Sequence, residues 1–298
     1  MKFDETRVTI RERSWLEILD LALRLYAEYW RLLSVTFVLA ALPLAVANDL
    51  LVVRLMDFQW EEDPYAENVK FIFITSVLVF IQAPMASVFT TMLLGRIMFL
   101  QSPDLGSLVK QVFNLSPRWL ISQGLLRGSL LSLLFFIGMS ANKGDTRMTI
   151  FTLLTMLAVY LALLRSVRPF LIEVILLERP RYWSGRSDSL SLYQRMQKLH
   201  LVDMGDLIVR FIASGIFAMV LSVVIFQILW FVSWVVEGQT AWGPFLTRFC
   251  VPTAMWMTAA FFSVVRFLGY LDRRTRNEGW SVSLQLRAES QRLAQQWS

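Results

Sequence analysis

Residues 211–236 read FIASGIFAMVLSVVIFQILWFVSWVV and carry no charged side chain. An α-helix rises about 1.5 Å per residue, so a stretch of this length crosses the roughly 30 Å hydrocarbon core of a bilayer. Inside lipid the backbone amides find no water, and a single stretch can satisfy them only as a helix. This stretch therefore predicts a transmembrane helix and places the chain among the membrane proteins.

Five more apolar runs resemble the first in length and composition. They cover residues 32–53, 71–94, 119–141, 148–164 and 249–265. The charged side chains within these runs are Asp49 and Arg127. Hydrophobic residues make up 56% of the chain, and no soluble core needs six such runs. We therefore predict an all-α, polytopic membrane protein with six transmembrane helices.

Lysine and arginine concentrate in alternate gaps between the runs. Of the 29 such residues, all but five lie in residues 1–31, 95–127, 165–210 or 266–298. Cytoplasmic loops carry this excess, so we expect both termini on the cytoplasmic side of a bacterial plasma membrane. The same bias accounts for the net charge of +6. We therefore expect anionic lipid headgroups, and no nucleic acid, as partners of the basic face.

The whole chain, 1–298, is interpreted as one integral membrane domain. Its first part is amphipathic, and Ser14 and Glu17 have the spacing of a capping box that begins a helix. Aromatic residues near the end of that helix suit a position in the membrane interface. The predicted parts are a cytoplasmic amphipathic segment 1–31, a six-span bundle 32–265 with a cytoplasmic loop 165–210, and a cytoplasmic tail 266–298.

The tail carries the most distinctive motif, YLDRRTRNEGW at residues 270–280. Weaker matches elsewhere are Glu17-Ile18-Leu19-Asp20, Leu94-Gly95-Arg96, Arg168-Pro169-Phe170 followed by Glu178, and Arg186-Ser187 with Leu190. With these motifs the chain resembles bacterial polytopic membrane proteins of the glycerophosphoryl diester phosphodiesterase membrane-domain or YciC-like group. It departs from their pattern at Arg273, where leucine is usual. The resemblance implies a six-helix protein with an accessory role beside envelope enzymes.

Residues that carry catalytic or metal chemistry are scarce. The chain has one histidine, His200, and one cysteine, Cys250. These cannot build the histidine and carboxylate site of the soluble phosphodiesterase that gives the group its name. The sequence has no Gly-x-Ser-x-Gly elbow, phosphate-binding glycine loop or Cys-x-x-Cys motif. We expect no enzymatic activity, no catalytic residue, no cofactor and no metal site.

Arg127 is the one basic side chain inside an apolar run, and intramembrane charge is a functional hypothesis by default. A transporter would use Arg127 to contact a substrate or a counter-ion. In the alternative, which we favour, Arg127 forms a structural pair or extends to the cytoplasmic interface. Asp49 lies near the external end of the first run, within reach of water.

Charges near the cytoplasmic ends of the fourth and sixth runs predict a docking contact. Glu173 and Glu178 would accept charge-assisted hydrogen bonds from Arg273, Arg274 and Arg276. Independent solvated faces are the alternative. The candidate contact residues of this face are Arg168, Glu173, Glu178, Asp272, Arg274, Arg276 and Glu278.

These observations favour a non-enzymatic accessory or scaffold protein of a bacterial envelope system, which binds lipids or other envelope proteins. The second hypothesis is a small-molecule transporter or channel subunit. A polar cavity that reaches Arg127 would favour the transporter, whereas a closed bundle would favour the scaffold.

Overall fold

The computed structural model describes residues 13–56, 64–98, 104–125, 127, 146–180, 191–200, 204–238 and 242–277. These residues are helical almost throughout and include no β-strand. Four helical segments are long and apolar enough to cross a membrane, namely Trp15–Leu50, Asn68–Ala86, Met204–Val236 and Leu246–Asn277. The all-helical fold is therefore confirmed, and these long apolar helices are compatible with a membrane protein.

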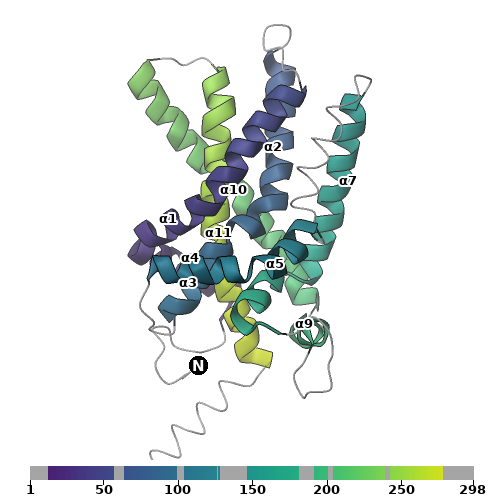
Figure 1. The fold of residues 1–298 in the computed structure, drawn as a ribbon. Helices are drawn as coiled ribbons and strands as arrows, with labels where there is room; N and C mark the ends of the chain where they lie inside the picture. Colours follow the sequence, from purple (N-terminus) through teal and green to yellow (C-terminus); the bar gives the residue numbers. More distant parts are fainter. Residues whose placement is uncertain are drawn as a thin grey trace, which may run out of the picture.

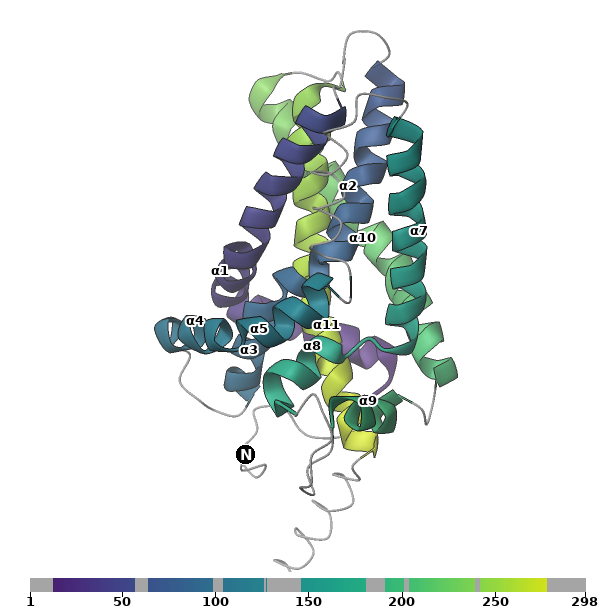
Figure 2. The same cartoon turned by 45° about the vertical axis from the view of Figure 1, so that its right-hand side comes forward.

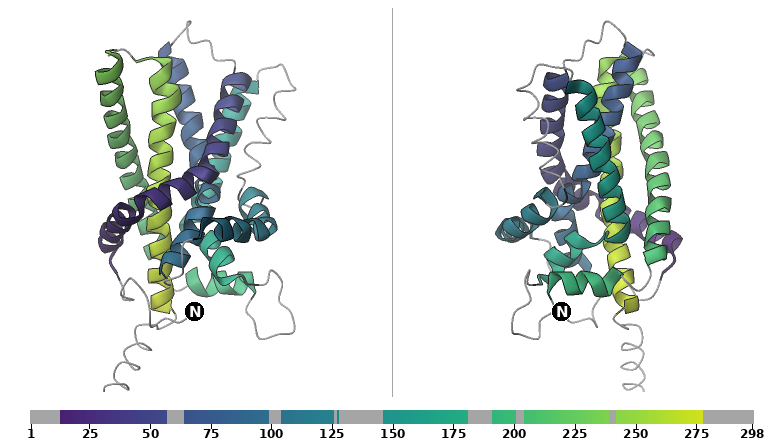
Figure 3. Two further views of the ribbon diagram at one scale, coloured as in Figure 1. Left: turned by 60° about the vertical axis from the view of Figure 1, so that its left-hand side comes forward. Right: turned by 90° about the vertical axis from the view of Figure 1, so that its right-hand side faces the viewer.

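The first long helix, α1 (Trp15–Met56), begins at the predicted capping box. The Ser14 amide donates to Glu17 Oε2 at 2.9 Å, and the Glu17 amide donates to Ser14 Oγ at 3.3 Å. A kink at Tyr29 (φ −113°, ψ 22°) then separates the amphipathic start from the apolar remainder. The two parts point in different directions (Figure 3). Residues 15–31 of the predicted amphipathic segment and the first apolar run therefore belong to one kinked helix.

The second apolar run is not one span. The helix α2 (Pro64–Ala86) ends before Ser87, and a shorter helix, α3 (Val88–Met98), follows. Pro84 lies inside α2 and has no N–H to donate to the Phe80 carbonyl, which favours a break here. Residues 88–94 therefore belong to a second element, and our expectation of one span over 71–94 is wrong in this respect.

Several short helices gather at the end of the molecule where α1 begins (Figures 1 and 2). Asp104 caps α4 (Leu105–Asn114) by accepting from the Gly106 and Ser107 amides at 3.2 and 3.1 Å. It is followed by α5 (Ser116–Trp119) and a π-helical segment η1 (Leu120–Leu125). Most of the third run, from residue 128 onward, lies outside the described residues.

The fourth run forms α7 (Thr146–Val167), which stands beside α2 (Figure 1). The chain breaks at Pro169, as a proline predicts, and continues as α8 (Leu171–Glu173) and the π-helical η2 (Val174–Glu178). Arg179, with φ 52°, ends η2 in the left-handed region. The helix α9 (Leu192–His200) packs against η2.

The last apolar run is the centre of the fold. The π-helical η4 (Leu246–Cys250) leads into α11 (Val251–Asn277), which packs against α1, α2, α3, α9 and α10. Its buried side chains include Phe261, Phe267 and Tyr270. It continues past Arg266 as one helix, so the expected boundary between bundle and tail at 265/266 falls inside α11.

The helix α10 (Met204–Glu237) contains the stretch 211–236 and packs on α11 and α7. No residue in the most apolar stretch of α10 is buried within the chain. Met219 is 73% exposed and Val236 is 77% exposed. A helix that is apolar on every side suits contact with lipid.

Candidate functional site

Two groups of charged residues bind other parts of the fold to the end of α11. One group surrounds Glu178 at the end of η2. The Tyr270 hydroxyl donates to Glu178 Oε1 at 2.6 Å, and Arg195 donates to both carboxylate oxygens, with its Nη2 3.1 Å from Oε1. Arg274 Nε lies 3.8 Å from the same oxygen. The structure therefore brings Glu178 and Arg274 together, as the docking hypothesis requires.

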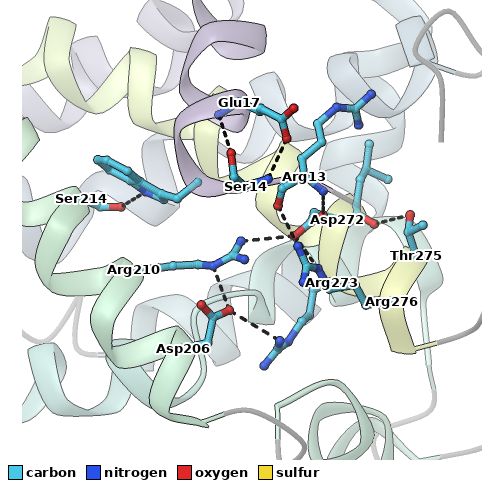
Figure 4. A network of polar contacts seen from close by, with 12 residues as sticks. Arg13, Ser14, Glu17, Asp206, Arg210, Ser214, Asp272, Arg273, Thr275 and Arg276 are labelled. Atoms are coloured by element: carbon cyan, nitrogen blue, oxygen red, sulfur yellow. Dashed lines mark hydrogen bonds and ion pairs between the residues drawn. The ribbon is translucent and has the colours of Figure 1, made fainter. Parts of the chain in front are cut away.

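The second group surrounds Asp272, which is 3% exposed (Figure 4). Asp272 accepts from the Arg13 amide at 2.8 Å, from Arg210 Nη1 at 3.2 Å and from Arg276 Nε at 3.1 Å. Arg276 also donates to the Arg13 carbonyl at 2.7 Å. One buried carboxylate thus joins the chain just before α1, the start of α10 and the end of α11.

Asp206 extends this group at the surface. Its Oδ2 lies 2.9 Å from Arg210 Nε and 3.8 Å from Arg273 Nη1 (Figure 4). Arg273 is 3% exposed and also donates to the Leu199 carbonyl at 3.3 Å. Arg273 therefore attaches α11 to α9 and to the start of α10.

Glu173 differs from the prediction in its partner. Its side chain is fully buried, and its Oε1 lies 2.5 Å from Arg266 Nε. Arg266 lies about two helical turns before the predicted tail arginines. It also donates to Ser87 Oγ at the α2–α3 break. The expected pairing of Glu173 with Arg273, Arg274 or Arg276 is thus replaced by a pair deeper in the bundle, because α8 lies alongside that earlier part of α11.

Arg127 and Arg168 come together through a backbone bond. Arg127 is 3% exposed and donates to the Arg168 carbonyl, next to the break at Pro169. The Arg168 side chain is exposed and lies over the Tyr193 ring, 5.6 Å from its centroid. This geometry fits the structural alternative for Arg127. Glu278 lies outside the described residues.

Arg165 is a buried residue that sequence reasoning missed. It is 7% exposed and donates to the carbonyls of Phe80 and Ile81, with its Nη2 2.6 Å from the Ile81 oxygen. The Phe80 carbonyl is the one that Pro84 leaves without an intrahelical donor. The sequence shows an arginine at the end of one apolar run and a proline inside another. Nothing in the sequence indicates that these two residues lie close together in the fold.

His200 is buried as well, with 1% of its surface exposed. Its Nδ1 lies 2.7 Å from the Met196 carbonyl, and its ring stacks on Phe170 with centroids 5.7 Å apart. Burial, opposed by the Met196 bond and aided by the nearby arginines 273, 127 and 168, lowers the pKa of His200 to about 4. A neutral imidazole in this position serves packing.

At the opposite end of the bundle, Asp49 forms an ion pair. Both of its carboxylate oxygens accept from Arg248 at 2.6 Å, a bidentate pair between α1 and η4. Among the described residues, no group of three or more His, Cys, Asp or Glu side chains could hold a metal ion.

Comparisons with known proteins do not extend this description. No protein-family model, curated protein or solved structure matches the chain.

Proposed function

We propose that this protein is a non-enzymatic scaffold or accessory protein of a bacterial inner membrane, with six spans and both termini in the cytoplasm. In this proposal the third span comprises the run 119–141 and the fourth span is α7. The start of α1, before the kink at Tyr29, lies in the membrane interface. Membrane lipids and other envelope proteins are its partners, as the resemblance to the YciC-like group also implies.

One observation carries the proposal, namely the platform of α3, α4, α5, α8, η2 and α9 around the end of α11 (Figures 1 and 2). Charge-assisted bonds at Glu178 fix η2 and α9 of this platform to α11, and such bonds are stronger than neutral ones. Large apolar side chains remain on its surface, since Phe113 is 61% exposed and Tyr193 is 60% exposed. A fixed surface with exposed aromatic side chains is suited to binding a protein partner.

Co-purification from the native host tests the scaffold role. The full chain would be extracted in mild detergent and its associated proteins identified and quantified. A partner of the platform should be lost when Phe113 and Tyr193 are both changed to Ala. Phe231→Ala provides the matched control, because Phe231 is 59% exposed on α10, outside the platform. Retention of every stoichiometric partner by the platform variant, or the absence of any such partner, would contradict the scaffold role.

Cysteine labelling tests the orientation. Cys250 is the one native cysteine and is buried, so each site would be placed in a Cys250→Ala background. Cysteines at positions 62 and 239 should react with an impermeant thiol reagent in intact cells. A cysteine in place of Lys110, which is exposed on α4, should react only after the cells are permeabilised. The reverse pattern would overturn the proposed topology.

A small-molecule transporter is the second candidate, because arginines lie inside the bundle. It predicts that reconstituted vesicles take up an anion, and that this uptake falls at least tenfold when Arg127 is changed to Gln. Uptake at the level of empty vesicles would remove this candidate.

A further inference from the structure

Positive charge exceeds negative charge inside the bundle at the α2–α3 break. Arg165 donates to the Phe80 and Ile81 carbonyls of α2, a few residues before the break. Arg127 donates to the carbonyl of Arg168, about one turn after Arg165. Arg266 donates to Ser87 Oγ at the break itself. Three guanidinium groups therefore share one region with the carboxylate of Glu173. That carboxylate already pairs with Arg266. Among the described residues, these three guanidinium groups carry two positive charges more than Glu173 balances, and the exposed Arg168 adds to the positive potential near Arg127.

The rest of the sequence offers little to balance this excess. Within the six apolar runs the one acidic residue is Asp49, and it is bound to Arg248 at the other end of the bundle. The next acidic residue after Glu173 is Glu178, which accepts from Tyr270 and Arg195. An uncompensated buried charge costs several kcal/mol. A balancing anion is therefore expected from outside the chain.

Several buried polar atoms of nearby residues lack a hydrogen-bond partner within the described part of the chain. Gln123 is fully buried, and neither its amide nitrogen nor its oxygen makes a hydrogen bond. The Nε atoms of Arg127 and Arg165 are buried and unbonded too, as are the hydroxyls of Thr90 and Thr91. Gln123 precedes Arg127 by four residues, and the two threonines follow Ser87, the Arg266 contact, by about one turn of α3. Most of these free groups are hydrogen-bond donors.

We propose that this region binds a phosphate group, held by Arg127, Arg165 and Gln123. Guanidinium groups match phosphate oxygens in geometry and retain their charge when buried. A phosphate carries one or two negative charges and several acceptor oxygens, which suits the excess charge and the free donors. The source is either inorganic phosphate or the phosphodiester of a lipid headgroup. This inference does not rest on the scaffold role, because it concerns the interior and not the platform.

Thermal unfolding of the delipidated full-length protein in detergent tests the proposal. We expect inorganic phosphate to raise the unfolding temperature by several degrees over chloride at equal ionic strength, since a ligand of the folded state stabilises it. In a second arm, phosphatidylglycerol is compared with diacylglycerol, which has the same tails without the phosphate. If phosphatidylglycerol raises the unfolding temperature at concentrations far below those at which free phosphate does, the ligand is a lipid headgroup.

Gln123→Leu is the decisive variant, because Gln123 makes no bond within the chain that its loss would break. It should raise the phosphate or lipid concentration needed for half of the stabilisation at least tenfold. Gln227→Leu, the same change at an exposed position of α10, should leave that concentration unchanged. The control also accounts for the general stabilising effect of phosphate salts. No shift beyond chloride and diacylglycerol, or equal responses of Gln123→Leu and wild type, would overturn the proposal.

Discussion

At the scale of single residues, buried arginines donate to backbone carbonyls at helix breaks near prolines. Pro84 has no N–H to donate to the Phe80 carbonyl, and Arg165 donates to this carbonyl instead. Arg127 donates to the Arg168 carbonyl beside Pro169. Inside a bilayer an unsatisfied backbone group costs several kcal/mol, so each helix break needs such a donor.

Arg165→Gln should therefore lower the free energy of unfolding by about 1.5–3 kcal/mol, the range for hydrogen bonds to charged groups. Pro84→Ala returns an N–H to α2, which can donate to the Phe80 carbonyl. The cost of Arg165→Gln should then be smaller in the Pro84→Ala background than in the wild type. Denaturant titration in detergent measures both costs. Pro43→Ala in α1 is the control, and an equal effect of the two proline changes would refute the pairing.

His200 predicts a dependence of stability on pH. Its pKa is about 4 in the folded protein and about 6.5 when unfolded, so the unfolded state binds the proton more readily. The neutral His200 side chain therefore contributes fully to the free energy of unfolding above pH 6.5. This contribution is lost as the pH falls from 6.5 to 4. The loss should reach about 2 kcal/mol at pH 5.

The matched variant is His200→Asn, whose amide nitrogen can still donate to the Met196 carbonyl but does not titrate. The difference between the unfolding temperatures at pH 7.5 and pH 5 should be larger in the wild type than in the variant. Both proteins share all other titrating groups, including Arg273, Arg168 and Arg127 near the ring. Parallel pH profiles would show that His200 is protonated in the folded state without penalty.

At the scale of helices, the sequence predicted what local rules decide. The capping box at Ser14 and Glu17 and the apolar helices follow from neighbouring residues. The break at Pro169 has a local cause as well, because proline has no N–H to continue the helix. The division of the second run did not, because it depends on Arg165, which is distant in sequence from Pro84. The partners of Glu173 and Asp272 likewise depend on how α8, α10 and the start of α1 lie against α11.

Asp272 should hold the start of α1 against α10 and α11. Asp272→Asn removes the negative charge that accepts from Arg13, Arg210 and Arg276. We expect amide hydrogen exchange to accelerate about tenfold or more in residues 15–28, before the kink at Tyr29. Exchange in the part of α1 after the kink should stay unchanged.

Asp206→Asn is the control for this prediction. Its side chain is 43% exposed and contacts Arg210, and no contact joins it to Arg13. Equal acceleration in both variants, or faster exchange along the whole of α1, would mean that Asp272 stabilises the fold generally and does not fix the start of α1.

At the scale of the whole molecule, charge and apolar surface lie in different places. The charged groups around Glu178 and Asp272 lie at the end where α1 begins and α11 ends, whereas α10 exposes apolar side chains along most of its length. A soluble protein rarely exposes such a continuous apolar surface. The arrangement fits a bundle that faces lipid along α10 and water at the basic end.

Lysine substitutions along α10 should locate the hydrocarbon core. Met219, near the middle of α10, is 73% exposed, and Met219→Lys should cost about 2.5–3.5 kcal/mol because the charge enters the centre of the bilayer. Val236 is 77% exposed at the end of the helix, where a lysine can extend its ammonium group to the interface at little cost. We therefore expect membrane-inserted, folded protein to fall sharply for Met219→Lys and to stay near wild type for Val236→Lys. Size-exclusion chromatography of membrane extracts measures both. Equal yields would show that the exposed face of α10 lies against water or a partner protein, because only lipid makes the cost depend on depth.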